Sequence, residues 1–259
     1  MEHILRYNRQ YRQGFTLVEL SVVLVIIGLI VGGVLLGRDM LRSSEIRSTL
    51  AQVEQFKTAS TTFKIKYNCL AGDCINASSF LSDAGGVANG NGNSKFDGGG
   101  NRWSDPESLY FWQHLGLANL ILFRHTPAII GGAYRPDINY PSAKLGGGFG
   151  AWGLQNYTAG GLIGTGKAFP AQYRNNLLLG RNWADTSSRI PLNPILSGYD
   201  ALAIDIKYDD GKAAYGNIVT WQNTSNYSGG CATTDVADTA EYTPTNTATC
   251  SLFFLNIFY

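Results

Sequence analysis

Residues 14–37 read GFTLVELSVVLVIIGLIVGGVLLG, a run that is apolar from Phe15 to Gly37 and contains one charged residue, Glu19. A helix of these 23 residues is about 34 Å long, which is enough to cross a hydrocarbon core of roughly 30 Å. Residues 1–14 hold three arginines and one acid, and such a basic flank favours a cytoplasmic N-terminus. The stretch therefore predicts a membrane-spanning helix at 15–37, preceded by a short basic segment.

The position of Glu19 separates two interpretations of this helix. A plain membrane anchor explains the length and the flanks, but a carboxylate in a membrane helix costs a few kcal/mol and calls for a partner. Cleavage between Gly14 and Phe15 would place the new α-amino group of Phe15 about one helical turn from Glu19, or beside Glu19 of a neighbouring subunit. An ammonium–carboxylate pair that forms only when subunits stack would favour assembly and fix the axial register. An ordinary secretory signal fits poorly, because its apolar region is about 7 to 15 residues.

The residues Gly14-Phe15-Thr16-Leu17-Val18-Glu19-Leu20, with the apolar run that follows, resemble the leader junction and first helix of type IV pilins and type II secretion pseudopilins. The resemblance covers residues 9 to about 67. It implies that residues 1–14 are a prepilin leader, that a prepilin peptidase cleaves after Gly14 and methylates Phe15, and that Glu19 acts in assembly. Many major subunits of this family have a proline near the position of Leu36, and this chain has none there.

The pattern after the apolar run predicts that the helix continues. Between Ile46 and Tyr67 the apolar residues recur at steps of three and four, with charged residues between them, as expected of a helix that buries one face. No proline interrupts the chain from Phe15 to about Lys66. We therefore expect one long helix, with a membrane or filament-core part at 15–37 and an amphipathic part at 38–67.

Residues 68–259 are predicted to form a globular α+β domain, with an antiparallel β-sheet on which the long helix packs. The 31 glycines of the chain favour many turns and long loops. We expect a short helix over Ser108–Ile121, strands joined by loops in the region 131–170, and a buried final strand in 252–259. Alternating apolar residues predict a β-hairpin within Ala201–Val219, with its turn at Asp209-Asp210-Gly211-Lys212.

The four cysteines form two sequence-local pairs, Cys69 with Cys74 and Cys231 with Cys250, without histidines at zinc-ligand spacing. Disulfides are the simpler interpretation, and they would place the domain in an oxidising compartment such as a periplasm. Pairing between neighbours is one of three connectivities.

An asparagine-rich loop contains the candidate metal ligands. Apart from a calcium ion in this loop, the sequence predicts no cofactor. Its oxygen-bearing side chains stand at alternate positions, as in calcium loops: Asn89, Asn91, Asn93 and Asp97. Ser94 stands where an EF-hand has glycine, and Gly100 stands where it has a bidentate glutamate. A turn region rich in Asn and Gly is the alternative to a calcium site.

The sequence favours a structural subunit over an enzyme or a nucleic-acid-binding protein. It contains no nucleophile elbow, zinc signature or Walker loop. Residues 67–259 carry eleven Lys/Arg against fourteen Asp/Glu, about three units negative, and show no basic run that would neutralise phosphates. No nucleic-acid partner is expected.

The resemblance implies a subunit of a pilus or secretion pseudopilus, and the mature length, 259 less 14 residues, resembles that of a minor subunit. The implied partners are the prepilin peptidase, other pilin or pseudopilin subunits, the inner membrane and an assembly platform. The implied location is the inner membrane with a periplasmic C-terminal domain, and then the filament. An adhesin or glycan-binding pilin that uses its C-terminal loops is the alternative.

Overall fold

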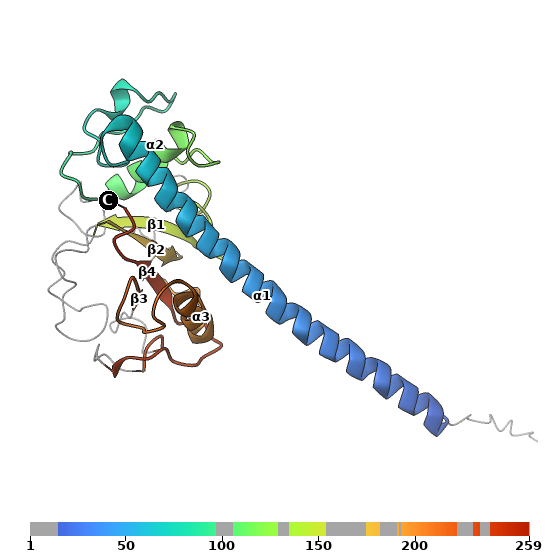
Figure 1. Ribbon diagram of the computed structural model, residues 1–259. Coiled ribbons are helices and arrows are strands. Elements are labelled where there is room, and N and C mark those ends of the chain that lie inside the picture. Colours follow the sequence, from blue (N-terminus) through green and yellow to red (C-terminus); the bar gives the residue numbers. More distant parts are fainter. Residues whose placement is uncertain are drawn as a thin grey trace, which may run out of the picture. The chain divides into compact units, whose positions relative to one another are not determined.

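One helix, α1, takes up the predicted apolar and amphipathic runs together and extends over Leu17–Tyr67. The structure, a computed structural model, describes residues 15–96, 106–128, 135–153, 175–181, 191, 193–221, 230–233 and 239–258. The further elements are η1 (Ala77–Ser79), α2 (Glu107–Leu117), β1 (Gly148–Gly153), β2 (Asn175–Gly180), α3 (Gly198–Tyr208), β3 (Ile218–Trp221) and β4 (Ser251–Phe254) (Figure 1). The fold is α+β, as the sequence predicts.

The two parts of α1 belong to different compact units, which meet between Ser44 and Glu45. In the first unit, every large apolar side chain from Leu17 to Leu36 is at least half exposed. By length and composition, α1 is suited to cross a membrane, and it is the one such helix among the described residues. In the second unit one face of α1 is buried, as the amphipathic pattern predicts. Its buried residues are Ile46, Thr49, Val53, Phe56, Ala59, Ser60 and Phe63, whereas the predicted Leu50 and Tyr67 are partly buried.

The sheet is antiparallel throughout, with strand order β1-β2-β4-β3. All six residues of β2 are buried, and its centre is the run Leu177-Leu178-Leu179. A strand that is apolar at consecutive positions requires cover on both faces. Helix α2 contacts β1, and α3 contacts β3 (Figure 1). The predicted final strand is confirmed as β4, and the predicted short helix as α2.

Helix α1 enters the core of the second unit through Phe56. Its ring meets Trp112 of α2 edge-on at 5.0 Å between centroids, and Phe149 of β1 at 5.2 Å. Polar contacts add to this packing: Gln52 Nε2 donates to the carbonyl of Ser142 at 3.0 Å, and Gln52 Oε1 accepts from the N–H of Lys144 at 3.1 Å. Helix α1 is thus joined to β1 by burial and to the loop before β1 by paired hydrogen bonds.

The predicted hairpin within Ala201–Val219 is wrong in its first arm, which is helix α3. Ser197 caps this helix, because its Oγ accepts from the N–H of Asp200 at 3.1 Å and donates to the carboxylate of Asp200 at 2.6 Å. Ala201 and Ile204 are buried three residues apart, whereas Ile206 is 62% exposed. The sequence of this segment therefore fits a helical period as well as the alternation of a strand, and the N-cap at Ser197 favours the helix. The predicted turn residues, with Gly211 at φ +76°, instead belong to the loop that joins α3 to β3.

The remaining predictions on the domain have mixed outcomes. Strand β1 lies in the region 131–170, of which residues 131–134 and 154–170 lie outside the described ranges. Both cysteine pairs form disulfides between sequence neighbours, Cys69–Cys74 and Cys231–Cys250. The first bridge follows the end of α1, and the second connects the residue preceding β4 to the loop before it.

The core contact of Phe56 generates a stability prediction. Phe56→Ala leaves a cavity between Trp112 and Phe149, so the free energy of unfolding should fall by about 3–5 kcal/mol. Denaturant unfolding of the detergent-solubilised chain, followed by near-ultraviolet circular dichroism, measures it. Thr61→Ala, at an exposed position of the same helix, should change that energy by less than about 0.5 kcal/mol. Equal effects of the two substitutions would contradict the packing described.

Candidate functional site: the N-terminal segment of helix α1

The beginning of α1 is organised by reciprocal hydrogen bonds between Thr16 and Glu19. The backbone N–H of Thr16 donates to Glu19 Oε2 at 2.8 Å, and Thr16 Oγ1 donates to the same oxygen at 2.9 Å. The N–H of Glu19 donates back to Thr16 Oγ1 at 3.2 Å. Thr16 immediately precedes the helix, and Glu19 is its third residue, so the two form a capping box. The carboxylate thus has hydrogen-bond donors within its own chain.

This role of Glu19 is additional to the one that the sequence analysis predicts. The signal for it is present in the sequence, since Thr-x-x-Glu before an apolar run is the pattern of a capping box. A negative side chain in the first turn also interacts favourably with the helix dipole. Phe15 is 89% exposed beside this turn, and Gly14 lies outside the described residues. Cleavage and methylation at Gly14 and Phe15 stay predictions.

Comparison with protein families bears on the same segment. Residues 9–35 match the family model of the prokaryotic N-terminal methylation motif. The segment is a prepilin-type cleavage and methylation segment. Such segments begin type IV pilins and pseudopilins, and this one supports a pilin-like or pseudopilin subunit that is processed by a prepilin peptidase and assembles with other pilin subunits. Comparisons with curated proteins and with solved structures give no match.

The prepilin-type segment agrees with the exposed apolar half of α1. A helix that is long and apolar enough to cross a membrane follows the motif directly, as membrane anchoring before pilus assembly requires. Outside a bilayer, side chains at 17–36 with half or more of their surface exposed need apolar cover. The segment therefore has two suitable environments, a membrane and the interior of an assembly.

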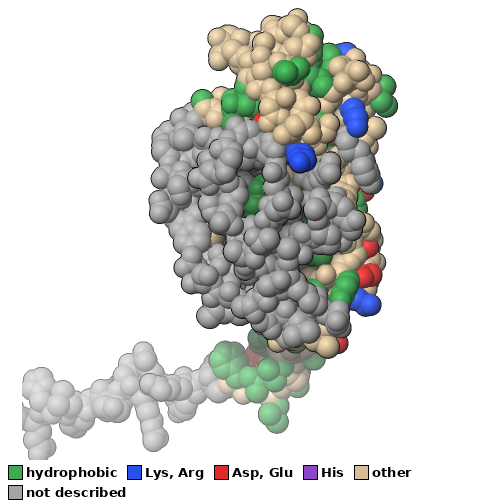
Figure 2. Space-filling view, turned by 90° about the vertical axis from the view of Figure 1, so that its left-hand side faces the viewer, with side chains coloured by type: hydrophobic (Ala, Val, Ile, Leu, Met, Phe, Trp, Pro, Cys, Tyr) green, Lys and Arg blue, Asp and Glu red, His purple; other side chains and the backbone are tan. Residues whose placement is uncertain are grey.

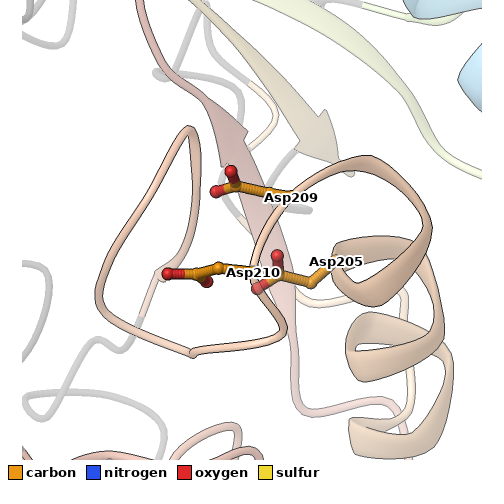
Figure 3. Close-up of side chains that lie close together, drawn as sticks. All are labelled: Asp205, Asp209 and Asp210. Carbon is orange, nitrogen blue, oxygen red and sulfur yellow. The ribbon is translucent and has the colours of Figure 1, made fainter.

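A second group of titratable side chains lies where α3 ends. Asp205, Asp209 and Asp210 bring carboxylate oxygens within 4.8 Å of one another (Figure 3). Asp205 is fully buried; its oxygens accept from Tyr242 Oη at 2.7 Å and from the N–H of Gly211 at 3.2 Å.

The rest of this cluster organises the turn that follows α3. Asp209 accepts from the N–H of Ile218 at 3.0 Å and from the backbone and side chain of Asn217. Asp210 accepts from the N–H of Lys212 at 2.8 Å. Three carboxylates can in principle converge on a divalent cation, but each of these already accepts hydrogen bonds from the chain. The cluster holds the loop between α3 and β3.

Burial changes the protonation of this cluster. It raises the pKa of Asp205 from 3.8 to about 7, the hydrogen bonds from Tyr242 and Gly211 oppose that rise, and the charges of Asp210 and Asp209 add to it. Burial also raises the pKa of Tyr242, so its hydroxyl stays protonated and acts as the donor. Asp205 is thus a buried carboxyl group that titrates near neutral pH.

The asparagine loop of the calcium prediction is arranged around a carboxylate that the sequence analysis did not single out. Asp73 is buried and accepts from the N–H groups of Gly92, Asn93 and Ser94, at 2.7, 3.1 and 2.6 Å. Asp73 lies 19 residues before Gly92, so no local pattern indicates this contact.

The predicted calcium ligands have partners of their own where the structure describes them. Asn89 Oδ1 accepts from the N–H of Ser78 at 2.9 Å, Asn91 Oδ1 from Asn93 at 3.0 Å, and Asn93 Oδ1 from Lys95 at 2.9 Å. Asp97 lies outside the described residues. These bonds are typical of asparagine turns, and the calcium site stays a prediction.

The histidines among the described residues, His114 and His125, are buried and have low proton affinity. His114 Nδ1 accepts from the N–H of Gly72 at 2.8 Å, and Nε2 lies 2.8 Å from the carbonyl of Ala88, so the neutral ring with the proton on Nε2 satisfies both contacts. Burial lowers the pKa of His114 to about 4, and that of His125 also to about 4. His114 therefore ties two loops to α2.

The capping box predicts a local effect of Thr16. Thr16→Val removes two of its three hydrogen bonds, so the opening free energy of the first turn should fall by about 1 kcal/mol. Amide hydrogen exchange at Leu17–Leu20 in detergent micelles measures it. Thr16→Ser keeps the hydroxyl and should restore protection. Exchange that is equally fast in the serine variant would show that the cap does not hold this turn.

The buried carboxyl group predicts a pH-dependent stability. Because the pKa of Asp205 is about 7 in the folded chain and 3.8 ordinarily, the folded state keeps a proton that the unfolded chain releases. The contribution of Asp205 is then full below about pH 4 and is lost as the pH rises through about 7. The melting temperature of the Asp205→Asn variant should rise relative to the unsubstituted chain between about pH 4 and about pH 8. A constant difference across this range would refute the assignment.

Proposed function

We propose that this chain is a minor structural subunit of a type IV pilus or a type II secretion pseudopilus and has no catalytic role. The observation that carries the proposal is the prepilin-type segment at residues 9–35, together with a capped, exposed and apolar helix that begins at Leu17. A prepilin peptidase cuts between Gly14 and Phe15 and methylates Phe15. The mature chain then leaves the inner membrane and enters a filament through α1.

Glu19 provides the electrostatic contribution to assembly. In the uncut chain its carboxylate accepts from Thr16. Cleavage creates an ammonium group on Phe15, four residues before Glu19, and a neighbouring subunit brings a second such group. In the apolar interior of a filament an unpaired carboxylate is strongly unfavourable, so subunits assemble in the register that pairs these groups.

The globular domain lies in the periplasm before assembly. Two disulfides in the domain support an oxidising compartment, and the basic flank at residues 1–14 favours a cytoplasmic N-terminus. The described Lys and Arg side chains visible in Figure 2 stand apart from one another and form no basic stripe on that face.

The proposal predicts a mass change and a charge-dependent assembly. Intact-mass measurement of the membrane-extracted chain, expressed with and without a prepilin peptidase, should show loss of residues 1–14 and one added methyl group only when the peptidase is present. Glu19→Gln keeps an acceptor for the capping box but removes the charge. It should lower the amount of chain in sheared filaments by at least about tenfold, since an unpaired buried charge costs several kcal/mol.

The control for this variant is Glu45→Gln, at an exposed acid of α1 outside the apolar run, which should assemble normally. An uncut chain beside an active peptidase would sink the proposal. Normal assembly of the Glu19→Gln variant would instead remove the charge pair from the mechanism and leave the processing intact.

A further inference from the structure

A short two-stranded ladder lies near the C-terminus, outside the four-stranded sheet. Its two segments, 231–233 and 241–243, run antiparallel. The N–H of Thr233 donates to a carbonyl of the second segment at 2.9 Å, and the N–H of Thr243 donates to a carbonyl of the first at 2.8 Å. Residues 241–243 are called the latch segment below.

The latch segment contacts both ends of helix α3. At the end of α3, the buried Tyr242 donates from its Oη to Asp205 at 2.7 Å. Figure 3 shows Asp205 on the helix, beside the turn that follows it. At the beginning of α3, the carbonyl of Thr243 lies so close to Gly198 that a Cβ at that position would overlap it. The segment is therefore joined to α3 by a backbone contact and by one buried pair of side chains.

The ladder is short enough to open without the rest of the globular unit. It consists of one isolated bridge, between Ala232 and Tyr242. The hydroxyl of Thr243 is buried there and has no hydrogen-bond partner among the described residues, which costs free energy in the closed arrangement. A segment with few contacts opens at a lower free energy than the whole unit. The disulfide between Cys231 and Cys250 keeps the ladder attached to the residue before β4 when it opens.

Ionisation of Asp205 acts against the closed arrangement. Burial raises the pKa of this carboxyl group to about 7, the hydrogen bonds from Tyr242 and Gly211 oppose the rise, and the charges of Asp210 and Asp209 add to it. When the latch segment opens, water reaches Asp205 and its pKa returns towards the ordinary value of 3.8. The closed arrangement thus binds the proton more tightly than the open one, so a rise in pH favours opening.

The charges around Asp205 reinforce this direction. Strand β3, which contacts α3, has no charged side chain. The other charged side chains of the second half of α3, the turn after it, the latch segment and the part of α1 opposite Tyr208 are exposed: Lys207, Lys212, Glu241 and Glu54. Asp209 and Asp210 are therefore the charged groups near Asp205 in the part of the chain that the structure describes, and both are negative.

We propose that Asp205 and Tyr242 form a proton-controlled latch, in which residues 241–243 lie closed on α3 while Asp205 is protonated and open locally when Asp205 ionises. The disulfide limits how far the segment moves. A change from slightly acidic to slightly alkaline solution then alters the surface at the C-terminal loop while the sheet stays folded. The latch belongs to the globular unit alone and goes beyond the proposed function.

Amide hydrogen exchange of the full chain in detergent micelles tests the latch. The amides that report opening are those of Thr233 and Thr243, which form the ladder. Asp205→Asn keeps an acceptor oxygen for Tyr242 but does not ionise. At each pH the exchange rate of the unsubstituted chain is divided by that of the variant, which cancels the pH dependence of the exchange chemistry itself. This ratio should rise at least about tenfold from about pH 5 to about pH 8, and a constant ratio overturns the proposal.

A second variant leaves the buried pair intact and changes only its electrostatics. Asp210→Asn removes one of the charges that raise the pKa of Asp205 and keeps an acceptor for the N–H of Lys212. The pH at which exchange of the ladder amides stops responding to Asp205 should therefore be lower than in the unsubstituted chain. Asp83→Asn, at an exposed acid of another loop, is the matched control and should leave that pH unchanged. Identical pH profiles in the two variants overturn the proposal.

The amides of β4 distinguish local opening from unfolding of the whole unit. They should stay protected between about pH 5 and about pH 8 while the ladder amides lose protection, since a local opening leaves the sheet intact. If exchange in β4 rises by the same factor as in the ladder, Asp205 acts on the whole unit and the latch is refuted. The measurement requires neither cleavage at Gly14 nor assembly, so its outcome is independent of the proposed function.

Discussion

A carboxylate at the start of an apolar helix needs hydrogen-bond donors in every environment that the helix enters, and α1 begins with such a group. Thr16 supplies two donors to Glu19 from within the chain. The capping box therefore lowers the cost of placing Glu19 near a membrane interior. The proposed cleavage before Phe15 would add a cation to the same turn, and the carboxylate that Thr16 first satisfies within the chain would then be available for pairing between subunits. In the proposed function, the first turn of α1 therefore acts in helix capping, in membrane insertion and in assembly.

The remainder of α1 shows how one helix serves two compact units. Up to Leu36 its apolar side chains are exposed on all sides, which suits lipid or other helices. From Ile46 onward one face is buried, and Phe56 joins α2 and β1 at the core. Gln52 and Glu54 add polar ties, to the loop before β1 and to Tyr208 of α3. The part of α1 from Glu45 onward is therefore an integral element of the globular unit.

The sequence predicts the features of this chain that depend on long periodic patterns. The apolar run follows from its length and composition, the stripe from Ile46 to Phe63 from helical periodicity, and the final strand from a short apolar run. The first arm of the predicted hairpin is a helix because Leu202, Ile204 and Ile206 fit two periods, and the cap at Ser197 decides between them. Short segments with balanced patterns depend on such single contacts.

The site residues also fall into two groups, those that a contiguous sequence pattern indicates and those that only the tertiary structure brings together. The segment around Gly14 and Glu19 is recognisable because its residues are contiguous, and the family match at 9–35 covers them. The partnership of Asp73 with residues 92–94 and that of Asp205 with Tyr242 join positions 19 to 37 residues apart. No local pattern encodes such distances, so tertiary structure alone reveals them. The capping role of Thr16 differs, because its Thr-x-x-Glu pattern is local and can be found in the sequence.

These distant carboxylates have a common physical role in a glycine-rich chain. Long loops of Gly and Asn leave many backbone N–H groups without strand or helix partners, and a buried N–H group without an acceptor costs free energy. Asp73 accepts from consecutive N–H groups of one loop, and Asp209 accepts from those of Asn217 and Ile218 in another. Each carboxylate supplies the hydrogen-bond acceptors that a helix or strand would otherwise provide to these N–H groups. The loops are therefore held in place although the domain has little regular structure. Their charge is then part of the fold, which explains why acids gather at the turns without a catalytic role being required.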